Sequence, residues 1–128
     1  MSFIQSNPNP KNARVGDCVI RAIAIATNST WEHVYSELAA YGFVMCDMPS
    51  SNAVWGQYLK DLGYKRGVID DNCPEDCYTI QRFCRDNPSG IFILGTGTHV
   101  VAVIDGSYFD TYDSGHEVQK FVQRIEQM

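Results

Sequence analysis

The amino-acid sequence predicts an α+β fold in a single domain spanning residues 1–128. Apolar side chains recur at helical spacing through much of the first two thirds of the chain, whereas from Gly90 onward the pattern is typical of strands. A chain of 128 residues, 45% of them hydrophobic, can bury a stable core without disulfide bonds or structural metal ions. We therefore expect N-terminal helices packed on a C-terminal antiparallel sheet.

The chain is expected to begin with an extended segment, followed by a buried helix. Residues 5–16 contain two Asn-Pro steps, and a residue that precedes proline avoids the helical conformation. Residues 18–27, CVIRAIAIAT, are apolar on nearly every side, which is typical of a central helix. Asp17 follows Gly16 directly and is expected to cap this helix.

Three further helices are expected before the sheet, at residues 30–42, 52–63 and 74–87. Ser29 and Glu32 have the spacing of a capping box, which would open the second helix. Gly42 is expected to end that helix, because glycine readily adopts the left-handed conformation found after helices. Pro74 is expected in the first turn of the fourth helix, where its missing N–H costs nothing.

Strands are expected at residues 64–69, 90–95, 99–105, 107–113 and 117–125, although the last segment is also compatible with a terminal helix. Asp105-Gly106 is a favoured two-residue hairpin turn between two of these strands. Such a turn pairs Ile104 with Ser107 and places His99 opposite Tyr112. The second half of the chain is therefore expected to contain a tight β-hairpin.

Cys18 is the candidate nucleophile. It lies in the first turn of the predicted buried helix, where the helix dipole and free backbone N–H groups stabilise a thiolate. The thiolate is the form in which a cysteine attacks a carbonyl group. The alternative is that Cys18 only packs in the core, because free cysteine is among the most buried residue types.

His99 and Asp110 are the candidate partners of this thiol. Alternate residues of a strand share a face, so the hairpin register places His99, Val101, Asp110 and Tyr112 together. Asp110 is then a diagonal neighbour of His99 and can orient its ring. Asp113 lies on the opposite face, and only a loop of odd length would exchange the two acids.

An oxyanion hole requires at least two hydrogen-bond donors. The backbone N–H of Cys18 is one natural donor at the start of the helix. Asn12, six residues earlier, is our candidate for the second donor, and Gln5 is a more distant alternative.

The order of these residues resembles the papain-like cysteine peptidase superfamily, in which a helix-start cysteine precedes a histidine and an aspartate on successive strands. The segment Gly16-Asp17-Cys18 is similar to the Asp-Cys-Gly step of bacteriocin-processing peptidases. Those enzymes carry a glutamine where this chain has Asn12, and a glycine where it has Val19. The strands that carry the histidine and the aspartate also resemble those of ubiquitin-like-protein peptidases.

The segments GDCVIRAIA, HVVAV and YFDTYDSG also resemble small uncharacterised proteins of Gram-positive bacteria and their phages. Together these resemblances imply a papain-like fold and a cysteine peptidase that needs no metal or cofactor. Its substrate would be a peptide or a protein. Two alternatives remain open: an acyltransferase or deamidase with the same site, and a non-catalytic binding module that keeps only the fold.

Composition limits the other classes of function. The net charge is −5 and the basic residues form no run, which argues against a nucleic-acid partner. No signal peptide and no apolar run long enough to cross a membrane are found, so we expect a cytoplasmic protein. Five cysteines fit a reducing compartment better than a disulfide framework, and the spacing of Cys46, Cys73, Cys77 and Cys84 is poor for zinc. The sequence does not determine the oligomeric state.

Overall fold

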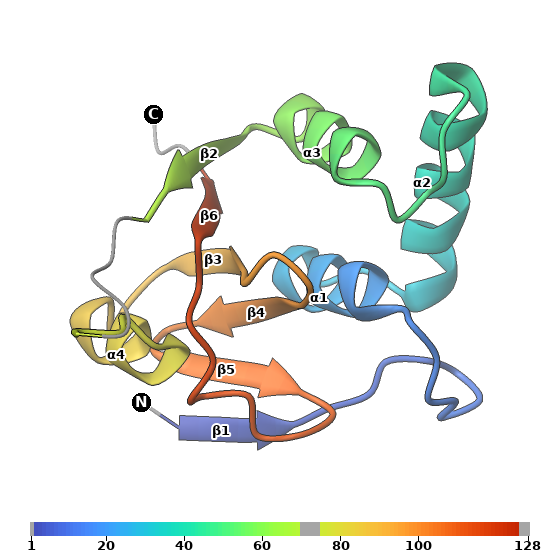
Figure 1. Ribbon diagram of the computed structural model, residues 1–128. Helices are drawn as coiled ribbons and strands as arrows, with labels where there is room; N and C mark the ends of the chain where they lie inside the picture. Colours follow the sequence, from blue (N-terminus) through green and yellow to red (C-terminus); the bar gives the residue numbers. More distant parts are fainter. Residues whose placement is uncertain (1, 70–74, 126–128) are drawn as a thin grey trace.

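The computed structural model describes residues 2–69 and 75–125 and has the expected α+β class (Figure 1). Within these residues the helices are α1 (Cys18–Thr27), α2 (Trp31–Met45), α3 (Asn52–Asp61) and α4 (Ile80–Asp86). The strands are β1 (Ser2–Gln5), β2 (Tyr64–Val68), β3 (Ile91–Gly95), β4 (Val100–Ile104), β5 (Ser107–Asp110) and β6 (Phe121–Ile125).

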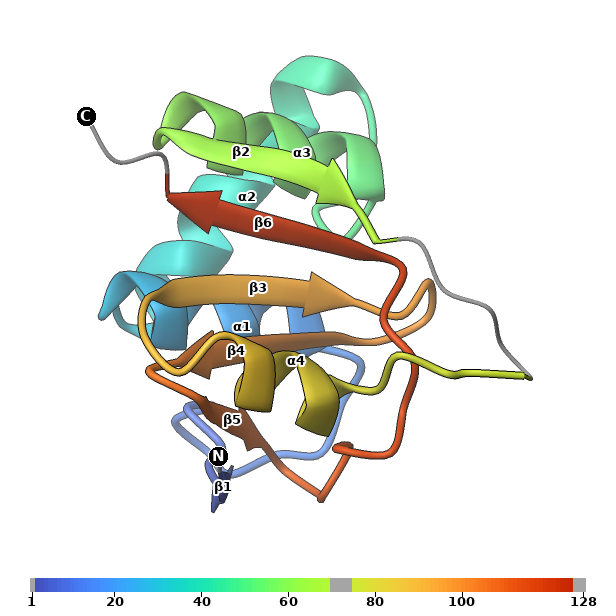
Figure 2. The same cartoon turned by 90° about the vertical axis from the view of Figure 1, so that its left-hand side faces the viewer.

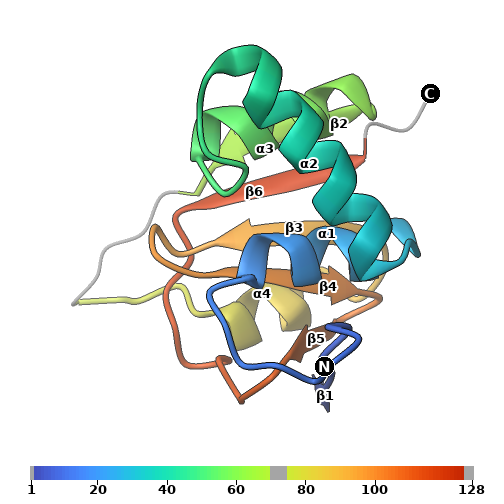
Figure 3. The ribbon, with the colours of Figure 1, turned by 90° about the vertical axis from the view of Figure 1, so that its right-hand side faces the viewer.

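The strands form one six-stranded sheet in the order β1-β5-β4-β3-β6-β2. Helices α1, α2 and α3 cover one face of this sheet, in front of it in Figure 3, and α4 lies on the other face, in front of it in Figure 2. The sheet is mixed rather than antiparallel, because β1 runs parallel to β5 at one edge. The expectation of an antiparallel C-terminal sheet is met only in part: β2 to β6 pair antiparallel, but β1, from the N-terminus, adds a parallel edge strand that was not predicted.

Each face of the sheet buries its own cluster of side chains. The larger cluster lies under α1, α2 and α3 and is centred on Ile23, Leu38 and Trp55, which are at most 1% exposed. The smaller cluster joins α4 to the opposite face and includes Ile80 and Tyr108. Because α1 lies in the middle of the larger cluster, its first turn is held firmly against the sheet.

The hairpin of β4 and β5 has the predicted turn and register. Ile104 pairs with Ser107, and both turn residues have positive φ, 49° at Asp105 and 80° at Gly106. Positive φ at both positions is what a type I′ turn requires. The turn therefore sets which residues of the two strands come together at their far ends.

Several predicted helix ends are wrong. Thr30 rather than Ser29 caps α2, since its hydroxyl accepts a hydrogen bond from the His33 N–H at 3.1 Å. Helix α2 also continues past Gly42 to Met45. A Cβ at Gly42 would lie 2.6 Å from the backbone oxygen of Asp47, so this glycine permits a close approach of the chain and does not end the helix.

Helix α4 is shorter than expected. It begins at Ile80, after Thr79, whose hydroxyl accepts from the Arg82 N–H at 3.3 Å. The prediction for Pro74 falls outside the described residues. The end of α4 at Asp86, just before Asn87, agrees with the expected boundary within the usual uncertainty of one or two residues.

Candidate active site

The structure brings Cys18, His99 and Asp110 together at one end of the sheet. Cys18 is the first residue of α1, His99 immediately precedes β4, and Asp110 is the last residue of β5. His99 Nε2 lies 2.6 Å from Asp110 Oδ2, and the His99 side chain interacts with the Cys18 thiol and lowers its pKa. Since Asp110 occupies Nε2, Nδ1 is the ring nitrogen left for the thiol.

The electrostatics of the pair favour a thiolate beside an imidazolium. Burial opposes ionisation of Cys18, but hydrogen bonds to His99 and to the Val100 backbone, with the charges of His99 and Arg21, lower the pKa of the thiol below 9.0. Burial also opposes protonation of His99, yet its hydrogen bonds to Asp110 and Cys18 raise its pKa from 6.5 to about 9. Each group therefore stabilises the charged form of the other.

Asp110 is almost fully buried and remains held as a carboxylate. Burial alone would raise its pKa, but hydrogen bonds from His99 and Ser114 lower it below 3.8. The Ser114 hydroxyl donates to Oδ2 at 2.7 Å, and the Thr111 N–H donates to Oδ1 at 2.8 Å. These bonds fix the carboxylate toward the histidine ring, as the third member of a triad must be.

Asp113 does not take this place. Its Oδ1 accepts hydrogen bonds from the Tyr108 hydroxyl and from the Gly115 N–H, the latter at 3.0 Å. Of the two aspartates, Asp110 therefore contacts His99 in this structure and Asp113 does not.

The predicted strand register correctly brings His99 and Asp110 together, but the residues around this pair differ from those expected. Val101 packs in the smaller cluster with α4, whereas Cys18 comes from α1 on the other side of the sheet. The contact between His99 and Asp110 forms at the very end of the sheet, because His99 precedes the first residue of β4. There the ring of His99 also lies beside that of Tyr112, with centroids 5.3 Å apart.

Arg21 is a residue of the site that the sequence analysis did not single out. It is 7% exposed, and its guanidinium bridges two carboxylates, forming an ion pair with Asp17 and lying 3.6 Å from Asp110 Oδ1. The signal in the sequence was a single arginine inside an otherwise apolar helix, one turn after Cys18. A buried arginine requires such partners, so it could have pointed to nearby acids.

Asp17 does not cap α1 with its side chain as expected. Its carboxylate instead accepts hydrogen bonds from Trp31 Nε1 at 2.9 Å and from Asn9 Nδ2 at 3.3 Å, in addition to the ion pair with Arg21. Three partners explain why the carboxylate turns away from the helix end. Asp17 thus anchors the start of α1 to both α2 and the N-terminal loop.

Asn12 is exposed and adopts a positive φ of 52°. Its Oδ1 accepts a hydrogen bond from Asn7 Nδ2 at 3.2 Å, and among the described residues no hydrogen bond joins it to Cys18. The structure thus does not bring Asn12 and Cys18 together, and its role as an oxyanion donor stays a prediction. Gln5, the alternative, is exposed and is the register partner of Asp110 between β1 and β5.

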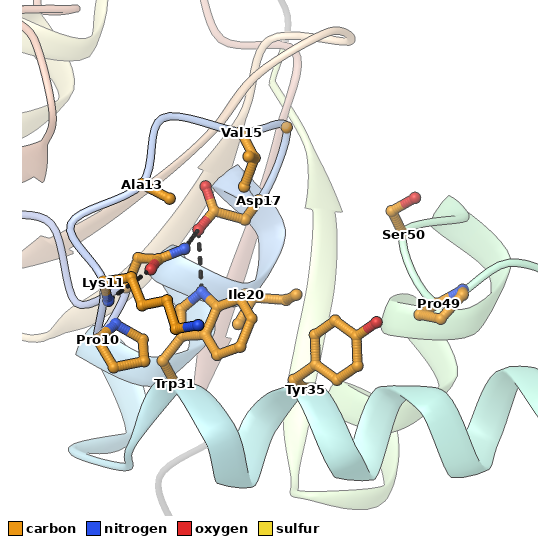
Figure 4. Close-up of a pocket in the computed structure, with 12 residues that line it drawn as sticks. Pro10, Lys11, Ala13, Val15, Asp17, Ile20, Trp31, Tyr35, Pro49 and Ser50 are labelled. Carbon is orange, nitrogen blue, oxygen red and sulfur yellow. Dashed lines mark hydrogen bonds between the residues drawn. The ribbon is translucent and has the colours of Figure 1, made fainter.

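A cavity of about 500 Å³ lies beside the start of α1 (Figure 4). Gly16 and Asp17, the two residues before Cys18, line it, together with the stacked rings of Trp31 and Tyr35. The other lining residues come mostly from the N-terminal loop and are Asn9, Pro10, Lys11, Ala13, Val15, Ile20, Pro49 and Ser50. Its volume is in the range of small-molecule and peptide side-chain sites.

Among residues 2–69 and 75–125, no three His, Cys, Asp or Glu side chains are grouped so as to hold a metal ion. Cys46 is an exposed free thiol and Cys84 a buried one, whereas Cys77 takes part in a disulfide, contrary to the expectation of reduced cysteines. No helix in the same residues is long and apolar enough to cross a membrane.

No protein-family model, curated protein or solved structure matches the chain.

Proposed function

We propose that this protein is a cysteine hydrolase with a papain-like fold that cleaves an amide bond in a peptide or protein. One observation carries the proposal: a cysteine at the start of a buried helix interacts with a histidine, and a ring nitrogen of that histidine lies 2.6 Å from a buried aspartate. This arrangement supplies an activated nucleophile, a proton carrier and an orienting acid.

In the proposed reaction the Cys18 thiolate attacks the carbonyl carbon, and the negative charge moves to the carbonyl oxygen. The N–H groups of the first turn of α1 can stabilise that oxyanion, with Asn12 as the predicted second donor. His99 then protonates the leaving amine as the C–N bond breaks, which leaves a thioester. Finally His99 removes a proton from water, which attacks the thioester and releases the acid and the Cys18 thiolate.

Asp110 remains ionised throughout these steps. Its hydrogen bond to His99 Nε2 keeps Nδ1 directed at the thiol and stabilises the imidazolium. The cavity lined by Gly16 and Asp17 offers a largely apolar surface beside the start of α1, although Cys18 itself does not line it. A cytoplasmic location and a peptide or protein substrate remain predictions.

The interaction of His99 with Cys18, which lowers the pKa of the thiol, supports a catalytic role over that of a non-catalytic binding module. Such a module would have no reason to keep the thiol within reach of the imidazole. Acyl transfer and deamidation use the same thioester intermediate and differ only in which nucleophile resolves it.

The proposal can be tested by the rate at which iodoacetamide alkylates each thiol, followed by mass spectrometry. Cys46 is a built-in control, because it is exposed whereas Cys18 is only half-exposed. We expect Cys18 to react at least about tenfold faster than Cys46 at pH 6, since the thiolate is the reactive species. Equal rates would reject the proposal, as would a Cys18→Ser variant that still cleaves a peptide library.

A further inference from the structure

Two charged side chains at the start of α1 lie beside the proposed catalytic groups. Asp17 directly precedes Cys18, and Arg21 follows one turn later. Asp17 is 4% exposed and Arg21 is 7% exposed, so both charges are removed from water. Burying two charges costs free energy that their mutual attraction often fails to offset, so the stability of the fold does not by itself explain the pair.

Arg21 faces two carboxylates through different nitrogen atoms. Its Nη1 forms the closer ion pair, with Asp17 Oδ1, and its Nη2 lies 3.6 Å from Asp110 Oδ1. The second distance is too long for a hydrogen bond, so Arg21 acts on Asp110 through its charge. Asp17 is itself held in place, because Trp31 Nε1 and Asn9 Nδ2 donate to its Oδ2 (Figure 4).

The two oxygens of the Asp110 carboxylate have different partners. Oδ2 lies 2.6 Å from His99 Nε2, whereas Oδ1 accepts from the Thr111 N–H and faces Arg21. Arg21 thus attracts the carboxylate without competing for the oxygen that His99 uses. An arginine that is not held elsewhere binds both oxygens of a carboxylate through its planar fork. Such a pair would weaken the contact between Asp110 and His99, and the ion pair with Asp17 opposes it.

The charges at this end of the sheet alternate in sign when Cys18 is a thiolate and His99 is protonated. Asp17 is negative, Arg21 positive, Asp110 negative, His99 positive and Cys18 negative. Burial raises the pKa of the thiol, and the charge of Arg21 is among the causes that lower it, although the interactions with His99 are larger. Without Arg21, two buried carboxylates and a thiolate would face a single imidazolium.

We propose that Arg21 and Asp17 are positioning residues of the site. Arg21 steadies Asp110 and supports the negative charge of the Cys18 thiolate, and Asp17 keeps Arg21 away from the oxygen that faces His99. This inference rests on the proposed function, because it concerns the charge of the same thiol. It also gives a reason for the acid at position 17, whose side chain does not cap α1.

Among the described residues, the other titratable groups around the site are few. Strands β3 and β4 pack against α1 and carry no charged side chain. The charged side chains of α2 and of the N-terminal loop are exposed or half-exposed and are Lys11, Arg14, Glu32, His33 and Glu37. Tyr112 lies beside His99, but burial and its hydrogen bond to Glu117 raise the pKa of Tyr112 above its usual 10.0, so it stays neutral below pH 9.

The test is the rate at which iodoacetamide alkylates Cys18 between pH 4 and pH 9, in full-length variants that each lack one charge. Removing a nearby positive charge raises the pKa of a thiol, and removing a negative charge lowers it. Arg21→Gln should therefore move the rise of the alkylation rate to higher pH by about half a pH unit, and Asp17→Asn should move it to lower pH. On the rising part of the profile, half a pH unit is about a threefold change in rate.

Shifts of opposite sign separate a positioning role from a purely structural one, because loosened packing around α1 would act in the same direction in both variants. Arg85→Gln is the matched control and should leave the profile unchanged, since Arg85 is exposed on α4, on the other face of the sheet. If circular dichroism shows that Arg21→Gln does not fold, the direction of the Asp17→Asn shift decides. Unchanged profiles, or shifts of the same sign, would overturn the proposal.

Failure of this inference differs from failure of the proposed function. If Cys18 of the native protein reacts no faster than Cys46, both proposals are rejected. If native Cys18 reacts faster and neither variant shifts its profile, the proposed function stands and only the role of Asp17 and Arg21 is rejected.

Discussion

Replacing Asp110 with asparagine removes the charge that faces His99 and keeps the size of the side chain. In the native protein the pKa of His99 is raised from 6.5 to about 9. This difference corresponds to roughly 3 kcal/mol in favour of the imidazolium, and Asp110 and Cys18 share it. If Asp110 supplies about half, its loss destabilises the imidazolium by roughly 1.5 kcal/mol, or about tenfold in an equilibrium constant.

The consequence for Cys18 is a loss of thiolate at acidic and neutral pH. A weaker imidazolium stabilises the thiolate less, so the pKa of Cys18 rises toward 9.0 in Asp110→Asn. The rate of alkylation of Cys18 by iodoacetamide, measured from pH 4 to pH 10, reports this change directly. At pH 6 we expect the variant to react about tenfold more slowly, and at pH 10 about as fast as the native protein.

Asp113→Asn is the matched control, because Asp113 is bonded to Tyr108 and Gly115 and not to His99. Its pH profile should follow that of the native protein. The reasoning is refuted if Asp110→Asn leaves the profile unchanged, or if both variants shift it equally. Circular dichroism of each variant checks that the fold persists.

Three further predictions concern stability, measured by urea unfolding. Arg21→Met leaves two buried carboxylates without their cation and should cost about 3–5 kcal/mol; a loss below about 1 kcal/mol would contradict the bridging role. Gly42→Ala should cost about 1–3 kcal/mol, because its Cβ would meet a backbone oxygen at 2.6 Å, whereas Gly56→Ala, with nothing within 4 Å, should be neutral or stabilising. The raised pKa of His99 contributes stability that is complete below pH 6.5 and is lost as the pH rises through about 9. The lowered pKa of Asp110 contributes stability that is complete above pH 3.8 and is lost in more acidic solution. The urea concentration at the midpoint of unfolding should therefore fall at both extremes of pH.

Local patterns predicted those parts of the fold that depend on neighbours in the sequence. The apolar segment 18–27 forms α1 with the expected ends, because a helix that is hydrophobic on all sides can only be buried. The Asp105-Gly106 turn fixed the register of β4 and β5, and that register brought Asp110 toward His99. The contact between His99 and Asp110 was predictable for this reason.

Features that depend on distant contacts were not predictable in the same way. Strand β1 has only four residues, and it forms by pairing in parallel with β5, about a hundred positions later. Gly42 looked like a helix end because glycine often is one, whereas its role is to let the chain after α2 pass close by. The contact of Trp31 with Asp17 spans 14 positions and had no local signal, whereas Arg21, four residues after Asp17, was a signal that the sequence analysis overlooked.

The contacts of Asp17 and Arg21 connect the cavity beside the start of α1 to the side chains around Cys18. Trp31 lines the cavity and donates to Asp17, Asp17 pairs with Arg21, and Arg21 reaches Asp110. Asp110 in turn sets the charge and orientation of the histidine that bonds to Cys18. Because every link is buried or half-buried, little reorganisation is possible around the thiolate, and such rigid polar surroundings are what stabilise developing charge in a reaction. The same side chains that fold the helix onto the sheet thereby hold the proposed nucleophile in its reactive form.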